Sequence, residues 1–322
     1  MYLITGGAGF IGSNIAEALL RRGEKVRILD NFSTGKRDNI TQIQSTLKAE
    51  SITNFDLELI EGDIRSYHIV REAVEGVDVV LHQAALPSVP RSVKDPLTSN
   101  EVNVVGTLNI LNAAKDVKVG RIVYASSSSV YGDLDVLPKT EDMLPKPLSP
   151  YAVTKLAGEK YCQVFTKLYG LETVILRYFN VFGPRQDPNS QYAGVIPKFI
   201  KLIKEGKSPV IHGDGAQSRD FTYVSNVVDA NLLACQQHSD DLSGEVFNIA
   251  FGKRITINDL VNSINKLLKT NIQPQYADSR PGDVKHSLAN IGKARQLLGY
   301  EPNVDFFTGL KKIVQDFQPI GQ

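Results

Sequence analysis

The first thirty residues constrain the fold of this chain more than any other stretch of it. A short apolar run over residues 2–5 leads into the turn Gly6-Gly7-Ala8-Gly9-Phe10-Ile11-Gly12, and residues 13–22 carry apolar side chains at helical spacing. This order of strand, glycine-rich turn and helix fits a dinucleotide-binding fingerprint, in which glycines let the backbone approach a pyrophosphate at the helix N-terminus. The residues expected to contact such a cofactor are Gly6, Gly9, Phe10, Ile11 and Gly12.

A carboxylate follows at the distance that this fingerprint requires. Residues 25–30 are typical of a second strand and end in Asp30, 18 positions after Gly12, close to the ~20 expected for the carboxylate that binds the adenosine ribose. Such a carboxylate repels a 2′-phosphate, so Asp30, with Asn31 beside it, favours NAD over NADP. Lys36 and Arg37 lie just beyond and keep NADP open as the alternative.

Strand-like and helix-like segments alternate along the following residues. The strand-like segments are 57–61, 77–82, 121–126 and 173–178, and the helix-like segments are 67–74, 92–117 and 151–169. This alternation predicts an α/β fold with a Rossmann-type, doubly wound parallel sheet, whose ligands bind beyond the carboxyl ends of the strands. The residues that fall there are Asp63, Gln83, Ala84, Ala85, Ser127 and Tyr178.

The character of the chain changes after Asn180, where prolines become frequent and the elements shorten. We predict a smaller α/β substrate-binding domain at the C-terminus, formed by residues 180–221 and 251–322. Residues 246–249 read as another strand of the first domain, so residues 1–179 and about 222–250 should form the cofactor-binding domain.

Composition limits the partners and the location. The 322 residues carry 36 basic and 35 acidic side chains, a balance that points neither to nucleic acid nor to a membrane surface. The apolar stretches are too short to span a bilayer and a strand begins at once, so we expect no signal peptide and a cytoplasmic protein. Cys162 and Cys235 read as free core thiols, and the scattered histidines argue against a metal site.

A tyrosine and a lysine stand four positions apart in the segment 151–169. On a helix these positions share a face. An ammonium within about 4–6 Å favours the ionised form of a phenol, whose ordinary pKa is near 10. Tyr151 is therefore a candidate general base for a hydroxyl group, with Lys155 as its electrostatic partner, and Ser127 can share or relay the proton.

Taken together, these residues make the chain resemble the extended short-chain dehydrogenase/reductases, and within them the UDP-sugar 4-epimerases of the N-acetylhexosamine branch. The resemblance covers essentially the whole length. Beyond the glycine turn and the Tyr151/Lys155 pair, it rests on Asp63-Ile64, His82-Gln83-Ala84-Ala85, Asn103, Ser127-Ser128-Ser129-Val130-Tyr131-Gly132, Arg177-Tyr178-Phe179-Asn180, Arg219-Asp220-Phe221 and Arg280-Pro281-Gly282-Asp283.

The resemblance implies a role for each of these residues. It implies a tightly bound NAD, with Asp63 and Ile64 at the adenine, Ala84 at the phosphates, Asn103 on the cofactor side and Tyr178 at the nicotinamide. Arginine suits a pyrophosphate through its planar fork of donors. The residues implied to bind the UDP-sugar are Ser88, Ser127, Ser128, Ser129, Asn180, Val195, His212, Arg219, Arg280, Asp283 and Ser287.

The implied reaction is inversion at C4 of a UDP-hexose through a transient 4-keto sugar, with no net redox change. Ser287 stands where epimerases restricted to UDP-glucose and UDP-galactose carry a large tyrosine, which favours interconversion of UDP-GlcNAc and UDP-GalNAc. Dehydratases and decarboxylases of the same fold carry acids where Ser128 and Ser129 stand.

Three alternatives stay open. The enzyme could be a 4-epimerase of UDP-hexuronic acids or of UDP-glucose and UDP-galactose, or the chain could be a noncatalytic NAD-binding module. In the family, two long helices corresponding to 92–117 and 151–169 form a homodimer interface, although the same apolar stripes can pack inside a monomer.

Overall fold

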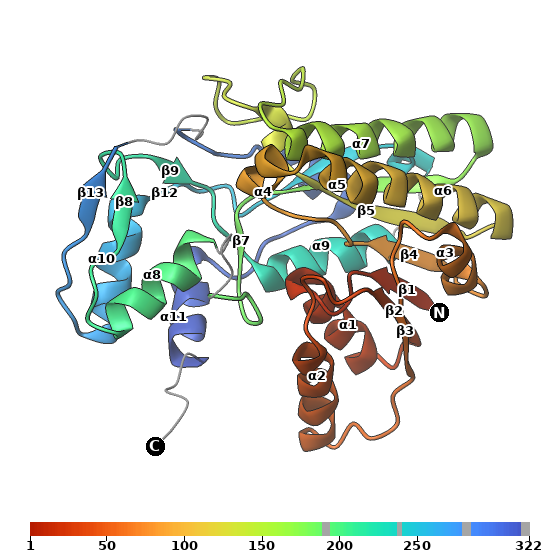
Figure 1. Ribbon diagram of the computed structural model, residues 1–322, viewed down its shortest axis with the longest axis horizontal. Helices are drawn as coiled ribbons and strands as arrows, with labels where there is room; N and C mark the ends of the chain where they lie inside the picture. The colour runs from red at the N-terminus through yellow and green to blue at the C-terminus, as the bar shows by residue number, and fades with distance from the viewer. Residues whose placement is uncertain (189–193, 237–239, 279–284, 317–322) are drawn as a thin grey trace.

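The computed structural model describes residues 1–188, 194–236, 240–278 and 285–316 (Figure 1). Within these ranges the central feature is a seven-stranded sheet in which all neighbouring strands are parallel. In spatial order the strands are β11 (Val246–Ile249), β6 (Glu172–Tyr178), β5 (Arg121–Ser127), β4 (Val79–His82), β1 (Tyr2–Thr5), β2 (Val26–Asp30) and β3 (Leu57–Glu61). The predicted Rossmann sheet is therefore confirmed, with residues 246–249 as its edge strand.

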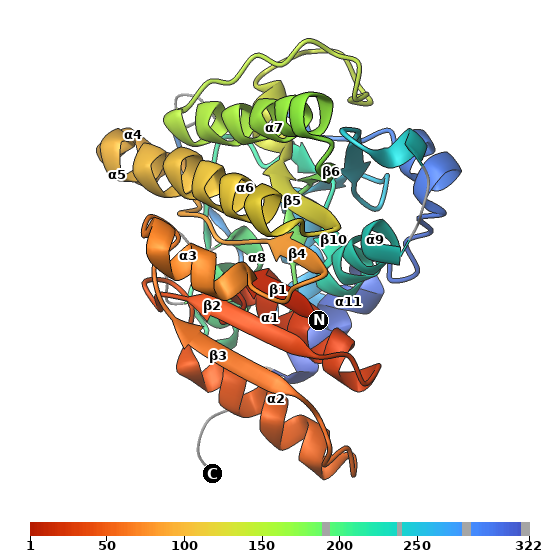
Figure 2. The same ribbon diagram turned by 90° about the vertical axis from the view of Figure 1, so that its right-hand side faces the viewer.

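Helices cover both faces of this sheet (Figure 2). One face carries α1 (Phe10–Arg21), α2 (Arg37–Ala49) and α9 (Val224–Gln236), and the other carries α3 (Tyr67–Val74), α6 (Gly106–Val117) and α7 (Pro150–Tyr169). Each face has its own apolar core, one around Ile4 and Phe247 and one around Leu3 and Ile175. The inner strands are thus buried on both faces, which explains why they are nearly continuous apolar runs, whereas the edge strand β3 is partly exposed.

The segment predicted as one helix over residues 92–117 is divided into four parts. They are α4 (Val89–Lys94), α5 (Pro96–Asn100), the π-helical turn η1 (Glu101–Val105) and α6. The prediction of a continuous helix is wrong because Asp95 ends α4 and its carboxylate caps α5, accepting from the Thr98 N–H at 3.1 Å. Pro96 follows as the first residue of α5, where its missing N–H costs nothing.

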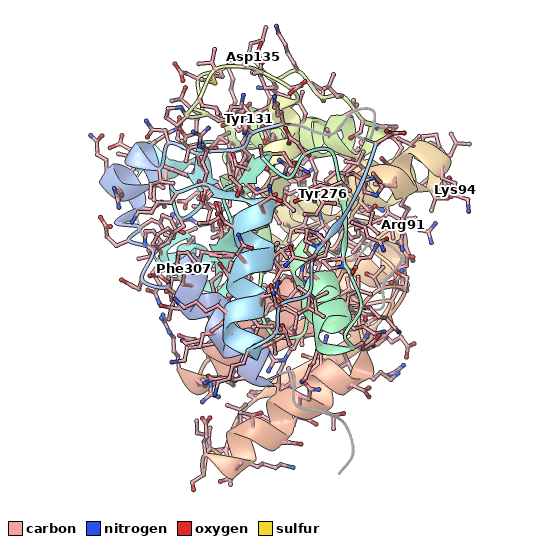
Figure 3. The ribbon with its side chains drawn as sticks, turned by 90° about the vertical axis from the view of Figure 1, so that its left-hand side faces the viewer. Arg91, Lys94, Tyr131, Asp135, Tyr276 and Phe307 are labelled. Carbon is pink, nitrogen blue, oxygen red and sulfur yellow. The ribbon has the colours of Figure 1, made fainter. Side chains whose placement is uncertain are left out.

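The second unit has a separate apolar core. Its helices are α8 (Val195–Lys204), α10 (Ile257–Leu268) and α11 (Phe306–Asp316). Its strands form three pairs: β7 (Val181–Phe182) with β10 (Thr222–Tyr223), β8 (Val210–His212) with β13 (Gln275–Ala277), and β9 (Ser218–Arg219) with β12 (Ile255–Thr256). The rings of Phe182, Phe221 and Phe306 pack together inside it. Tyr276 and Phe307 lie on its outer side (Figure 3).

The chain crosses between the two units several times. After the small unit it returns as α9, the short helix η3 (Asp240–Leu242) and β11, and residues 289–300, including the π-helical turn η4 (Ala294–Leu298), pack on the sheet core. Asp220 holds the crossings together: its buried carboxylate accepts N–H groups of Phe251, Gly252 and Ala289 at 3.1 to 3.2 Å. Burial raises the pKa of Asp220 to about 6.

Candidate active site

The glycine turn between β1 and α1 forms a cradle that side chains would fill. A Cβ at Gly12 would lie 2.3 Å from the Gly6 carbonyl oxygen, so no larger residue fits there. Gly6 has a φ of +70°, and a Cβ on it would lie 2.8 Å from the Ala84 backbone. The N-terminus of α1 opens directly onto this turn, with Gly9 as its N-cap residue. These residues fit the pyrophosphate of a dinucleotide.

A cavity of about 240 Å³ lies against this turn, at the carboxyl ends of the strands. Residues predicted to bind the cofactor that line it are Gly6, Gly9, Phe10, Ile11, Gly12, Asp30, Asn31, Ile64, Gln83, Ala84, Ala85, Tyr151, Lys155 and Tyr178. The residues that sequence reasoning missed are Leu29, Ser33, Thr34, Gly62, Leu86, Pro87, Val102, Ala125 and Ser126. Most of them flank a strand end, and their neighbours in the chain were predicted, so the same rule applied more widely would have found them.

The carboxylate of Asp30 lies at one end of this cavity. It accepts the N–H groups of Ala8 and Phe32 at 2.9 Å each, and burial raises the pKa of Asp30. Asp63 is not among the residues that line the cavity: its carboxylate pairs with Arg65 at 2.8 Å and accepts the Asn31 amide at 2.8 Å. The hydrogen bond from Arg65 lowers the pKa of Asp63 to about 2. Asp63 therefore orients Asn31 within the described structure.

Asn103 is buried and binds the backbone of Leu86, a residue that lines the cavity. Its amide group bonds the Leu86 backbone in both directions, at 2.8 and 3.2 Å, and donates to the Thr154 hydroxyl on α7 at 3.0 Å. The Asn103 carbonyl accepts the Thr107 hydroxyl at 2.6 Å. Asn103 thus fixes the loop after β4 to the helix that carries Tyr151.

His82 continues this hydrogen-bonded chain toward the glycine turn. Its Nε2 lies 2.9 Å from the Thr107 hydroxyl, and its Nδ1 lies 2.7 Å from the Thr5 hydroxyl. Because Thr107 donates to Asn103, it must accept from Nε2–H. Burial lowers the pKa of His82 to about 3. The lowered pKa keeps the ring neutral at neutral pH, so Nδ1 accepts from the Thr5 hydroxyl.

Tyr178 joins the cavity to α9. Its hydroxyl lies 3.1 Å from the Gln83 amide and 2.8 Å from that of Asn231, a fully buried residue that sequence reasoning missed. Burial raises the pKa of Tyr178, so the hydroxyl stays protonated. Gln83 and Tyr178 are therefore held in place by one another and by Asn231.

Tyr151, Lys155 and Ser127 come together where β5 ends beside the first turns of α7. Ser149 caps α7 by accepting the Ala152 N–H at 3.2 Å, and Pro150 follows as its first residue. The Lys155 ammonium donates to the Ala125 carbonyl at 2.9 Å, and burial lowers the pKa of Lys155 to about 8. Burial raises the pKa of Tyr151, and a hydrogen bond with the Ser127 side chain opposes that shift.

The expectation that Lys155 lowers the pKa of Tyr151 is therefore not met in this structure. Lys155 points to a strand carbonyl and not to the phenol, and desolvation outweighs the hydrogen bond from Ser127. The expected proximity of Ser127 and Tyr151 is present.

A buried ion pair, which sequence reasoning missed, supports this group. The Glu159 carboxylate, one turn after Lys155, accepts two bonds from Arg177 at 2.8 Å and one from the Ser126 hydroxyl at 2.5 Å. Arg177 lies on β6 and also stacks over the Tyr131 ring at 4.7 Å. A fully buried pair of this kind ties α7 to the ends of β5 and β6 and fixes the position of the helix.

A second cavity, of about 1140 Å³, lies between the loops after the sheet and the second unit. Five residues predicted to bind substrate line it: Ser88, Asn180, Val195, His212 and Arg219. Ser287 adjoins Asn180, whose amide lies 3.5 Å from the serine hydroxyl. Ser128 and Ser129 lie in the short 3₁₀ helix η2 (Ser128–Tyr131), where the Ser129 N–H bonds the Ser127 hydroxyl at 3.1 Å. Arg280 and Asp283 lie outside the described residues.

The described ranges contain neither a metal-binding cluster nor a membrane-spanning helix. In those ranges no three His, Cys, Asp or Glu side chains are grouped to hold a metal ion. None of the described helices has both the length and the apolar character needed to cross a bilayer. Cys162 and Cys235 are free and buried, as predicted.

Comparison with known proteins agrees with this site. The model of the NAD dependent epimerase/dehydratase family matches residues 2–250. A putative UDP-glucose 4-epimerase of Methanocaldococcus jannaschii is 40% identical over 98% of this chain and 97% of its own length.

Solved structures give the same result. A UDP-N-acetylglucosamine 4-epimerase from Methanobrevibacter ruminantium, in complex with UDP-N-acetylmuramic acid, superposes with a TM-score of 0.90 at 42% identity, covering 98% of this chain and 97% of that one. A UDP-glucose 4-epimerase from Thermotoga maritima, with UDP-glucose, gives 0.90 at 35% identity and covers 98% of both chains.

The fold and the site thus define a nucleotide-binding enzyme of the extended short-chain dehydrogenase/reductase type. The chain belongs to the NAD dependent epimerase/dehydratase family, and its cofactor is NAD. Within that family the similar proteins reported above are UDP-sugar 4-epimerases.

Proposed function

We propose that this protein is a UDP-sugar 4-epimerase that interconverts UDP-GlcNAc and UDP-GalNAc. The observation that carries the choice of sugar is Ser287, a small side chain beside Asn180 at the edge of the substrate cavity. A serine leaves room next to the sugar for an acetamido group, whereas a tyrosine ring at this position would fill it. The similarity to a UDP-N-acetylglucosamine 4-epimerase supports this proposal.

In this proposal, the residues where β5 ends beside α7 carry out the proton transfer. When bound, NAD would supply the acceptor for a hydride from C4 and the donor from which the same hydride returns. Tyr151 takes the proton of the C4 hydroxyl, and Ser127, which is bonded to the phenol, shares that proton. Lys155 has a pKa of about 8, so it is mostly charged at neutral pH, and its ammonium bonds the Ala125 carbonyl in this structure. We propose that this charge offsets the burial of the phenolate while Tyr151 acts as the base. Tyr151 later returns the proton to the C4 oxygen, after the 4-keto sugar has turned its other face toward the returning hydride.

Inversion requires the nucleotide to stay anchored while the 4-keto sugar turns over. Asn180 and Arg219 line the substrate cavity on the side of the second unit, well suited to hold a pyrophosphate. Arg280 and Asp283 are proposed to complete the binding site for UDP. Short side chains, such as those of Ser88 and Ser287, are proposed to face the hexose, which leaves it free to rotate.

Incubation of the purified protein with a panel of UDP-sugars, without added cofactor, tests the proposal. The panel contains UDP-GlcNAc, UDP-GalNAc, UDP-glucose, UDP-galactose and UDP-glucuronic acid, and proton NMR of the anomeric region detects the C4 epimer. Faster turnover of the two acetylated sugars supports the proposal. Preference for the glucuronate or for the unacetylated hexoses selects the corresponding alternative. NAD binding without turnover of any sugar points to a noncatalytic module.

We also propose that the protein is a homodimer. Apolar side chains are exposed along two packed helical segments, with Val93 64% and Leu97 77% exposed on α4 and α5, and Val153 53%, Val164 46% and Leu168 65% exposed on α7. Such a row on neighbouring helices is more than a monomer normally leaves in water. A second copy of the chain, presenting the same row about a two-fold axis, is the proposed partner.

A further inference from the structure

Charged side chains crowd the corner of the cofactor cavity where β2 turns into α2. Asp30 ends β2, and a Cβ on Gly35 would lie 2.8 Å from both of its carboxylate oxygens. Lys36 and Arg37 follow directly, as the N-cap and first residue of α2. Two cations at the positive end of a helix form a setting that attracts a phosphate group. NADP differs from NAD by one phosphate, at the ribose position that Asp30 is expected to bind.

Both cations are engaged by carboxylates from elsewhere in the chain. The Lys36 ammonium lies 2.8 Å from an Asp187 oxygen, with the side chains 48% and 30% exposed. Arg37 pairs with Glu61 at the end of β3 and also stacks over the Phe32 ring at 4.2 Å. Glu61 lies on β3, the strand next to β2, whereas Asp187 follows β7 and is distant in sequence.

Asp187 reaches this corner because its segment is fastened along α1. The Asn14 amide donates to the Pro184 carbonyl at 3.2 Å, and Arg185 pairs with Glu17, both largely buried. These contacts hold residues 184 and 185 against α1, and Asp187, two residues further on, pairs with Lys36 at the start of α2. Asp187 is therefore held in place and is not a carboxylate that meets Lys36 by chance.

We propose that Asp187 is a specificity-determining residue, which makes the site select NAD against NADP by neutralising Lys36. A 2′-phosphate would have to compete with Asp187 for that lysine and would face the Asp30 carboxylate as well. Without Asp187, repulsion by Asp30 alone would leave the Lys36 cation available to a dianion, since Arg37 is paired with Glu61. This inference rests on the family's cofactor and not on the sugar, so it can fail while the proposed epimerase activity holds, and the reverse.

The test compares Asp187→Asn with wild type. This change removes the charge and keeps the size of the side chain. The full-length protein is equilibrated with equal concentrations of NAD and NADP until the bound ratio is constant, then separated from free nucleotide, and the bound nucleotides are released and resolved by ion-exchange chromatography. The bound NADP:NAD ratio should rise about 3- to 10-fold, the size expected for a partly exposed charge acting on a phosphate.

Asp56→Asn is the matched control. Asp56 pairs with Lys25 at 3.6 Å, at the opposite end of β2 and β3, so this variant has the same change in net charge far from the ribose corner. It should leave the ratio within about twofold of wild type, because salt screens charges beyond roughly 10 Å.

Lys36→Gln shows whether the effect passes through the lysine. In that background Asp187→Asn should change the ratio by less than about twofold, because no cation is left to release. The proposal is overturned if Asp187→Asn leaves the ratio at the wild-type value, or if it raises the ratio equally with and without Lys36.

Discussion

At the scale of single residues, the proposed chemistry depends on two buried side chains whose pKa values move in opposite directions. Burial raises the pKa of Tyr151 and lowers that of Lys155 to about 8. Each shift disfavours a charged form; the bond to the Ala125 carbonyl offsets this for the ammonium, and the bond with Ser127 offsets it for the phenolate. Proton transfer from the sugar therefore depends on groups placed before the substrate arrives.

Replacement of Tyr151 by phenylalanine removes the hydroxyl and little else. We expect Tyr151→Phe to fold, to retain NAD and to lose about 10²- to 10⁴-fold in kcat, the usual contribution of a positioned acid or base. Steady-state rates and the absorbance of bound NAD measure the two effects. Tyr161→Phe, the same change farther along α7, is the control and should keep its rate. An active Tyr151→Phe enzyme would contradict the assignment.

Ser287 is the residue where the sugar preference can be tested. We expect Ser287→Tyr to lower kcat/KM for UDP-GlcNAc by about tenfold or more relative to UDP-glucose, because the ring fills the space beside Asn180. Ser287→Ala keeps the side chain small and should retain the acetylated substrate. Equal losses on both sugars in the tyrosine variant would remove Ser287 from substrate selection.

At the scale of elements, hydrogen-bonded side chains join the loop ends into one rigid frame. Thr5 on β1, His82 on β4, Thr107 on α6 and Asn103 on η1 form a single chain of bonds behind the cofactor cavity. Each of these groups is almost completely buried, so a break at any of them leaves a polar atom without a partner. The frame is polar inside but depends on a neutral imidazole at its centre.

The neutral imidazole of His82 makes the free energy of unfolding depend on pH. The pKa of His82 is depressed to about 3 in the folded protein, against 6.5 as its ordinary value. The unfolded chain therefore takes up a proton first as the pH falls, so this stability is complete above pH 6.5 and is lost progressively toward pH 3.

His82→Gln separates this effect from other acid effects. Glutamine keeps a donor and an acceptor but cannot be protonated, so the free energy of unfolding should fall less steeply between pH 6.5 and pH 4, by about 1.4 kcal/mol per pH unit at most. Urea unfolding followed by circular dichroism at several pH values measures the slopes. Parallel slopes in the two proteins would show that His82 does not set the acid sensitivity.

Most of the sheet could be predicted from sequence, because apolar runs and glycine turns mark parallel strands directly. The strands over 57–61 and 246–249 match the prediction, and β4 begins at Val79 where residue 77 was expected. The helix over 92–117 failed because apolar periodicity continues through Asp95 and Pro96, while the cap made by Asp95 depends on the turn that follows. Periodicity alone does not show such a break.

The site was predicted where a residue type has a direct role at the end of a strand or in the first turn of a helix. Gly12, Asp30 and Tyr151 are of this kind, and all three line the cofactor cavity. Glu159 and Asn231 were missed because their partners, Arg177 and Tyr178, are close only in the folded chain. No spacing in the sequence predicts such contacts.

At the scale of the whole molecule, the cofactor cavity and the substrate cavity lie on either side of the loops that leave the sheet, and the exposed apolar row lies on α4, α5 and α7 (Figure 1). Dimerisation through that row leaves both cavities open. It would also cover the exposed face of α7, the helix that carries Tyr151 and Lys155.

The dimer can be tested with one exposed residue. Leu97→Asp should fold as wild type does, because the side chain is 77% exposed in the single chain. In sedimentation it should shift from about twice the chain mass of 35.4 kDa to that mass. Phe307→Asp, on α11, makes a comparable change outside the row and should leave the dimer intact. A wild-type protein that sediments as a single chain would rule the dimer out.

The return of the chain to the sheet through β11 has a consequence for how such a protein can be divided or recombined. β11 closes the edge beside β6, so a fragment ending before residue 246 would leave β6 with an unpaired backbone. No single cut in the gene therefore releases a complete nucleotide-binding half. An exchange of sugar preference between relatives would have to replace two separate stretches, or change single residues such as Ser287 in place.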